Sequence, residues 1–167
     1  ELYDQACERL YAKVRACGAD VVQFGADVVG VGELAESTMK KFRRILATDL
    51  GPCTGARILE RFDENLHDVY HVVWNKIYKT GLVKQVFSRI EDGYFVAGED
   101  MYFLVILFDL AQSYDCTKAK YYRYLVGLGS IRGGVATLDD FRWKCNRAAC
   151  CQATERYLLG EVRRLFP

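Results

Sequence analysis

A helical spacing of carboxylates and imidazoles gives this chain its clearest candidate for metal chemistry. Four residues, separated by four, three and four positions, share one face if their segment is helical: Glu60, Glu64, His67 and His71. The two histidines could hold one divalent metal, with Glu64 as a third ligand. The chain has only two histidines, so a closed ligand set is missing. We therefore expect a solvated polar face here, and no metal or cofactor.

A second segment, from Lys118 to Tyr124, alternates cations with aromatic rings. Charge combined with stacking is used in single-stranded nucleic-acid binding. However, the formal net charge is only +1, which argues against a nucleic-acid partner. Tyr, Trp and Arg are concentrated at protein interface hot spots, so we predict a protein-contact surface. Its predicted residues are Trp74, Tyr121, Tyr122, Arg123 and Tyr124.

Motifs for catalysis are absent from the sequence. It contains no Gly-x-Ser-x-Gly, Walker A or His-Glu-x-x-His pattern. The glycines of residues 127–134 could approach a phosphate, but the chain after them is too short for another strand–helix–strand unit. We interpret that segment as a connector and expect a protein that binds rather than one that catalyses a reaction.

Seven cysteines suit an oxidised extracellular chain better than a cytosolic one. They are Cys7, Cys17, Cys53, Cys116, Cys145, Cys150 and Cys151. We expect six of them to form three disulfides, with the pairing left open. The odd cysteine would then be buried, free or linked to a second chain in a disulfide-bonded dimer.

The first residue is Glu1 rather than Met, from which we expect that a signal peptide has been removed and that the protein is secreted. The longest uncharged apolar run, residues 101–108, has eight residues, whereas a bilayer span needs about 20. We therefore expect no membrane span.

Apolar periodicity predicts helices along nearly the whole chain. A four–three spacing runs from Tyr3 to Val28, and a stripe from Ile58 to Ile77 predicts a long helix that ends at Gly81. Thr137 and Asp140 resemble a capping box that opens a last helix ending at Leu165. The predicted helices cover residues 2–29, 34–46, 54–80, 82–90, 101–110, 117–125 and 137–165.

These observations predict one all-α domain over residues 1–167, a disulfide-stapled bundle of about six or seven helices. Its predicted function is protein–protein recognition outside the cell, as a cytokine-like ligand, an inhibitor or an antagonist. The alternative is a carrier of a small hydrophobic ligand, held in a cavity lined by Phe, Tyr and Leu of the central helix.

Overall fold

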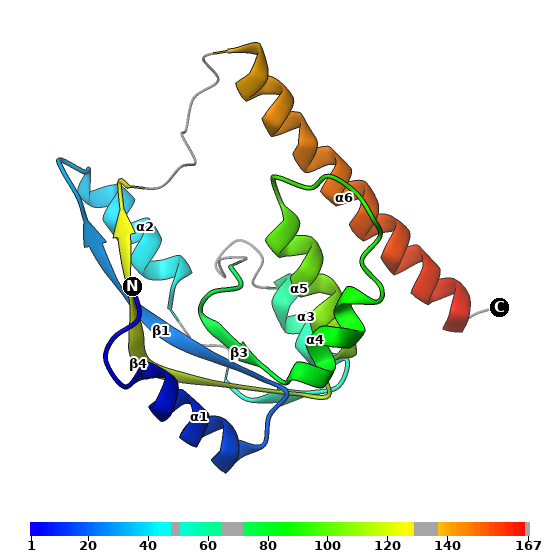
Figure 1. Ribbon diagram of the computed structural model, residues 1–167, viewed down its shortest axis with the longest axis horizontal. Coiled ribbons are helices and arrows are strands. Elements are labelled where there is room, and N and C mark those ends of the chain that lie inside the picture. The colour runs from blue at the N-terminus through cyan, green and yellow to red at the C-terminus, as the bar shows by residue number, and fades with distance from the viewer. Residues whose placement is uncertain (48–50, 65–71, 129–136, 166–167) are drawn as a thin grey trace.

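The chain forms a mixed β-sheet with helices on both faces, so the predicted all-α bundle is wrong. The computed structural model describes residues 1–47, 51–64, 72–128 and 137–165, and the side chains as far as residue 161. Helix α1 lies on one face of the sheet, and helices α3, α4 and α5 lie on the other (Figure 1). In chain order the elements are α1 (Ala6–Cys17), β1 (Val21–Gly30), α2 (Glu36–Ile45), β2 (Cys53–Thr54), α3 (Arg57–Glu64), β3 (Lys76–Tyr78), α4 (Thr80–Phe87), α5 (Glu99–Leu110), β4 (Ser113–Val126) and α6 (Leu138–Leu165).

The sheet has the strand order β2-β4-β1-β3. Its two long central strands, β1 and β4, are parallel, and the short edge strands β2 and β3 are antiparallel to their neighbours. The register slips in the middle of the central pair: Phe24 pairs with Thr117, but Gly25 pairs with Lys120. A Cβ atom on Gly25 would lie 3.1 Å from the carbonyl oxygen of Lys118, so glycine lets the two backbones approach at this bulge.

The segment expected to be one helix over residues 2–29 is a helix followed by a strand. Gly18 ends α1 with a φ of 67°, and its N–H donates to the carbonyl of Val14 at 2.8 Å. Strand β1 then begins at Val21. Val21 and Val22 are both fully buried, because helices cover the central strand on both faces. A strand of this kind has a near-continuous apolar run, in which a helical spacing can occur by chance.

Two further predicted helices are also corrected. Residues 117–125 belong to strand β4, in agreement with the preference of tyrosine and threonine for strands. The helix predicted over residues 54–80 is reduced to α3, and Ile77 lies in strand β3, paired with Val22. Gly81 lies inside α4 instead of ending a helix. Residues 65–71 of this prediction lie outside the described part of the chain.

The helical predictions at α2, α4, α5 and α6 are confirmed. The capping box is present at the start of α6, where the backbone N–H of Thr137 donates to Asp140 Oδ2 at 2.9 Å and that of Asp140 donates to Thr137 Oγ1 at 3.1 Å. Helix α5 is the centre of the main core. Leu104, Ile106 and Leu107 are each 0% exposed, because the sheet, α3, α4 and α6 surround them.

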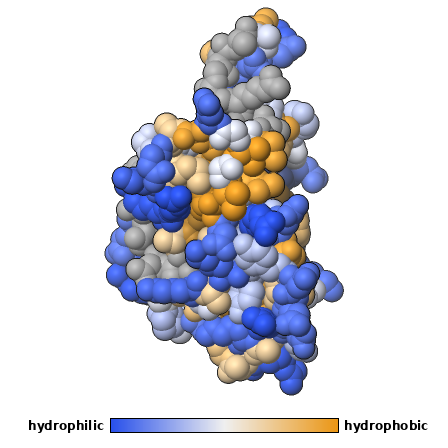
Figure 2. All heavy atoms as spheres, turned by 90° about the vertical axis from the view of Figure 1, so that its left-hand side faces the viewer, coloured by the Kyte–Doolittle hydropathy of each residue, from blue (hydrophilic) through white to orange (hydrophobic). Residues whose placement is uncertain are grey.

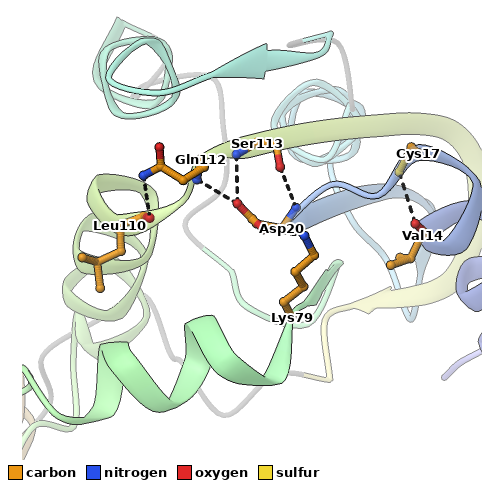
Figure 3. Close-up of polar contacts among 7 residues, drawn as sticks. All are labelled: Val14, Cys17, Asp20, Lys79, Leu110, Gln112 and Ser113. Carbon is orange, nitrogen blue, oxygen red and sulfur yellow. Dashed lines mark hydrogen bonds and ion pairs between the residues drawn. The ribbon is translucent and has the colours of Figure 1, made fainter.

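Asp20 connects three segments that meet at one end of the sheet (Figure 3). Its carboxylate accepts hydrogen bonds from the backbone N–H of Gln112 at 2.8 Å and of Ser113 at 3.1 Å, and it pairs with Lys79 Nζ at 2.7 Å. Burial raises the pKa of this carboxyl, but the hydrogen bonds from Lys79 and from the two backbone N–H groups outweigh burial and lower it. An ionised Asp20 therefore holds the starts of β1, α4 and β4 together.

The predicted disulfides are absent. All seven cysteines lie in the described part of the chain, and each is a free thiol. The fold does not depend on covalent staples, because α5 provides an extensive apolar core. The prediction of a disulfide-stapled bundle is therefore wrong. Within the described residues, no helix is both long enough and apolar enough to cross a membrane.

Candidate functional site

Three of the five predicted contact residues form one aromatic stack. The ring of Trp74 lies 4.4 Å from that of Tyr122 and 5.2 Å from that of Tyr124, in stacked geometry. Phe42 of α2 extends the stack, with its ring 5.7 Å from that of Tyr124. These rings are partly buried against the small core cluster of Ala26 and its neighbours. The sheet brings the four rings together, and we call them the aromatic stack.

The other two predicted residues, Tyr121 and Arg123, alternate with Tyr122 and Tyr124 along β4. Tyr121 packs edge-on against Phe24, with ring centres 6.1 Å apart. The guanidinium of Arg123 lies 5.6 Å from the ring centre of Tyr3, a cation–π distance. Side chains alternate along a strand, so these two residues lie on the face of β4 opposite to the aromatic stack. The structure therefore divides the predicted surface into two.

A pocket of about 380 Å³ opens where β1 and β4 slip in register, close to the aromatic stack. Three cationic side chains line it, Arg43 from α2 and Lys118 and Lys120 from β4, around an apolar floor. We call it the cationic pocket. The complete lining is Gly25, Ala26, Asp27, Val28, Arg43, Leu46, Ala47, Lys118 and Lys120. Its floor residues Ala26 and Val28 pair with Tyr122 and Tyr124 in the sheet, which places pocket and stack side by side.

Asp27 is the single carboxylate among the described residues that line the cationic pocket. It pairs with Lys120 Nζ at 2.7 Å and accepts a hydrogen bond from the Tyr3 hydroxyl at 2.7 Å. These two bonds lower the pKa of Asp27, so it stays ionised and offsets one of the three cations. Arg43 pairs with Glu36 at 3.1 Å, but Glu36 is outside the lining. The lining thus holds three cations and one carboxylate, and Glu36 offsets a second cation from outside the lining.

A second, larger depression of about 600 Å³ lies among α3, α5 and α6. Its walls are apolar, with three carboxylates among the lining residues. We call it the apolar groove, and its lining consists of Gly55, Ala56, Leu59, Glu60, Phe62, Asp63, Val105, Asp109, Gln112 and Leu158. Val105 and Asp109 belong to the central helix, which the sequence predicted to line a ligand cavity.

Lys76 is the most strongly perturbed cation in the described part of the chain. It is 5% exposed, and its Nζ donates to the carbonyl of Val72 at 2.7 Å and to Asn75 Oδ1 at 2.8 Å. Burial lowers the pKa of Lys76 to about 7. The nearby, half-buried Asp100 has a raised pKa, caused first by burial and second by Glu99. Lys76 and Asp100 line neither the cationic pocket nor the apolar groove.

The candidate metal ligands are not assembled by the described residues. His67 and His71 lie outside the described part of the chain. Glu64 is described, and it pairs with the guanidinium of Arg57 at 3.0 Å. Among the residues with described positions, no group of three or more His, Cys, Asp or Glu is placed to hold a metal.

An apolar patch lies on the side of the molecule where β1 and β4 end (Figure 2). Exposed apolar side chains at these strand ends include Val29 at 39%, Val31 at 37% and Leu128 at 63%. This patch is not evident from the sequence, because the exposure of apolar strand residues depends on which helices cover the sheet.

Sequence reasoning also missed the cationic pocket. The basic residues of α2 and the lysines of β4 are each visible in the sequence, but they are more than 70 positions apart. Only the placement of both elements against β1 brings them together. A comparison with models of known protein families found none that matches this chain, and a comparison with curated proteins found no match either.

Proposed function

We propose that this protein acts by binding, and that it recognises an acidic segment of a partner protein at the cationic pocket and the adjoining aromatic stack. The observation that carries this proposal is the convergence of Arg43, Lys118 and Lys120 around one pocket beside stacked, partly exposed rings. Acidic side chains of a partner would pair with the cations, and its apolar side chains would pack on the rings of the stack.

The chemistry of the surface favours a protein segment over a single small anion. A pocket of about 380 Å³ is large enough for two or three side chains but is open to solvent on one side. Trp and Tyr offer large, rigid contact areas and are enriched among residues that dominate binding energy. Cations at the rim raise the rate of association with an acidic partner and select against a basic one.

A fluorescently labelled random copolymer of Glu and Tyr is the probe for this proposal, with a Lys–Tyr copolymer as the opposite-charge control. We expect the Glu–Tyr copolymer to bind, with an affinity that falls as salt is added. The double variant Arg43→Glu/Lys118→Glu is expected to weaken binding at least about tenfold, since reversing two rim charges changes attraction into repulsion.

The matched control is Arg15→Glu/Lys84→Glu, which makes the same change in net charge at exposed positions of α1 and α4. It is expected to bind the copolymer within about twofold of the unchanged protein. An equal loss in both double variants would show that only net charge matters and would overturn the proposal. Circular dichroism of both variants verifies that they fold.

Tyr121 and Arg123 stay a predicted contact surface on the other face of β4. The double variant Tyr121→Ala/Arg123→Ala, titrated with the same copolymer, tests whether recognition extends to that face. Trp74→Leu tests the stack, where loss of a large ring is expected to weaken binding by roughly 2 kcal/mol, typical of a hot-spot residue.

Carriage of a small hydrophobic ligand is the second candidate function, and the apolar groove favours it. The groove of about 600 Å³ falls in the size range of small-molecule sites, and part of its lining comes from the central helix. The extracellular location and a dimer linked through a cysteine stay predictions. Seven free thiols give them no support.

A further inference from the structure

We infer that the apolar groove is a binding site for an amphiphilic organic cation, a molecule with an alkyl or aryl body and one positively charged head. This inference rests on the second candidate function, because it names the class of small ligand that the groove would carry. It is independent of the recognition proposed for the cationic pocket, which involves other elements of the fold.

The floor and walls of the groove suit an apolar body. Phe62 is 2% and Val105 is 8% exposed, so both present an ordered apolar floor. Leu59 of α3 and Leu158 of α6 border the groove from two sides, and Leu158 is 37% exposed. An apolar ligand would cover Leu59 and Leu158 and remove their exposed surface from water, which is the main favourable contribution to binding in such a site.

The charged residues among those that line the groove are all acidic. Its described lining contains the carboxylates of Glu60, Asp63 and Asp109, and none of these lining residues is Lys or Arg. Arg57, outside the lining, pairs with Glu60 at 3.0 Å and offsets that charge. The remaining two carboxylates flank the apolar surface from α3 and α5.

Asp109 is held in position for this role. The hydroxyl of Tyr157 in α6 donates a hydrogen bond to Asp109 Oδ2 at 2.5 Å. The pKa of Tyr157 is raised, first by burial and then by this bond and the charge of Asp109, so Tyr157 stays a donor. This hydrogen bond fixes the direction of the Asp109 carboxylate, which helps it to orient a cationic head.

Three probes of one chain length separate charge from apolar contact: octyltrimethylammonium, 1-octanol and octanoate, each used below its micelle concentration. In calorimetric titrations we expect the cation to bind about fivefold to tenfold more tightly than octanol, since each exposed carboxylate contributes modestly. Octanoate is expected to bind most weakly, because its charge is repelled by the rim.

Two variants test the assignment of residues. Asp63→Asn/Asp109→Asn is expected to abolish the preference for the cation while octanol still binds. Leu158→Gln, at a partly exposed position, is expected to weaken all three probes. The matched control Glu8→Gln/Asp92→Asn removes the same charge at exposed positions of α1 and of the segment after α4, and should leave all three affinities unchanged.

The outcomes distinguish this inference from the function on which it rests. Binding of octanol and of the cation with equal affinity would leave the groove as a hydrophobic carrier site and would overturn the inferred ligand class. Failure of all three probes to bind would overturn both. A preference for the cation that survives in Asp63→Asn/Asp109→Asn would place the cation elsewhere on the protein, and would also overturn the inference.

Discussion

Replacing Asp20 by alanine is expected to lower the free energy of unfolding by about 3 kcal/mol at pH 7. The Asp20 side chain is only 17% exposed, and it accepts two backbone hydrogen bonds from residues 112–113 and forms an ion pair with Lys79, so it joins its own segment to two others. Without the carboxylate, the N–H groups of Gln112 and Ser113 lose their charged acceptor at the point where α5 passes into β4. The ion pair with Lys79 is lost as well, whereas the backbone hydrogen bonds of residue 20 to Ser113 and Lys79 remain.

The magnitude follows from the separate contacts. A hydrogen bond to a charged group contributes about 1.5–3 kcal/mol, and the low end applies here because both backbone N–H groups donate to the same oxygen, Asp20 Oδ2. Lys79 is 49% exposed, so its ion pair adds less than about 1 kcal/mol. Asp20→Asn keeps an oxygen acceptor but loses the charge, and is therefore expected to cost roughly half as much as Asp20→Ala.

The lowered pKa of Asp20 gives this prediction a definite pH dependence. A carboxyl whose pKa is lower in the folded chain stabilises fully above its ordinary value of 3.8, and this contribution is lost as pH falls through the lowered pKa. The difference between the unchanged protein and Asp20→Ala is therefore expected to be largest above pH 5 and to decrease below pH 4.

Urea unfolding followed by circular dichroism at several pH values measures these differences. Asp92→Ala, at an exposed aspartate, is the control and should leave the unfolding midpoint unchanged. An Asp20→Ala midpoint equal to that of the unchanged protein would refute the reasoning. A deficit that stays constant between pH 6 and pH 3 would refute the assignment to the ionised carboxylate.

Three further predictions follow from the same structure. The pKa of Lys76 is lowered from 10.5 to about 7, so between these pH values the unfolded chain binds a proton that the folded chain does not. The free energy of unfolding should therefore rise from pH 7 to pH 9 in the unchanged protein but not in Lys76→Met. Urea unfolding at several pH values measures this difference. Gly127→Ala should destabilise the protein by about 2 kcal/mol or more, because φ is 104° and a Cβ would lie 2.6 Å from the Val31 carbonyl oxygen. Gly160→Ala should stabilise it by roughly 0.5–1 kcal/mol, because no atom would contact the added Cβ in the interior of α6. Thermal melts of the two variants compare these effects. Thiol titration without reductant should detect seven thiols in the unfolded chain, and Cys150, which is fully buried, should react only after unfolding. An intact mass lower by two units for each disulfide would contradict the prediction that all seven cysteines are reduced.

Helices whose signals are local could be predicted from the sequence. Helix α6 begins with a capping box formed by two residues three positions apart, and α5 is an apolar run introduced by two acidic residues. Strands β1 and β4 could not be predicted in this way, because each is stabilised by the other across more than 80 residues. Val21, Phe24 and Val28 satisfy a helical spacing equally well, so periodicity alone does not distinguish the two states.

The candidate site, like the fold, could be predicted from the sequence only in part. Trp74, Tyr122 and Tyr124 were predicted as contact residues from their types, and the structure brings all three into one stack. Their combination with Arg43 depends on the sheet, which the helical interpretation did not contain. The cysteines were misinterpreted for a different reason: their number and types permit disulfides, but only three-dimensional placement decides whether two thiols meet.

The parallel pairing of β1 with β4 determines when this protein can fold as it leaves the ribosome. Residue 113 follows residue 30 by 83 positions, so at about 5–20 residues per second roughly 4–17 s pass before the partner of β1 begins to be synthesised. Contacts this distant along the chain also slow folding, because the intervening loop must be closed before they stabilise anything. During that interval Val21, Val22 and Phe24 are without their final neighbours. The nascent chain is therefore expected to need chaperone protection of β1, and truncation before β4 should yield an aggregating product instead of a smaller folded unit.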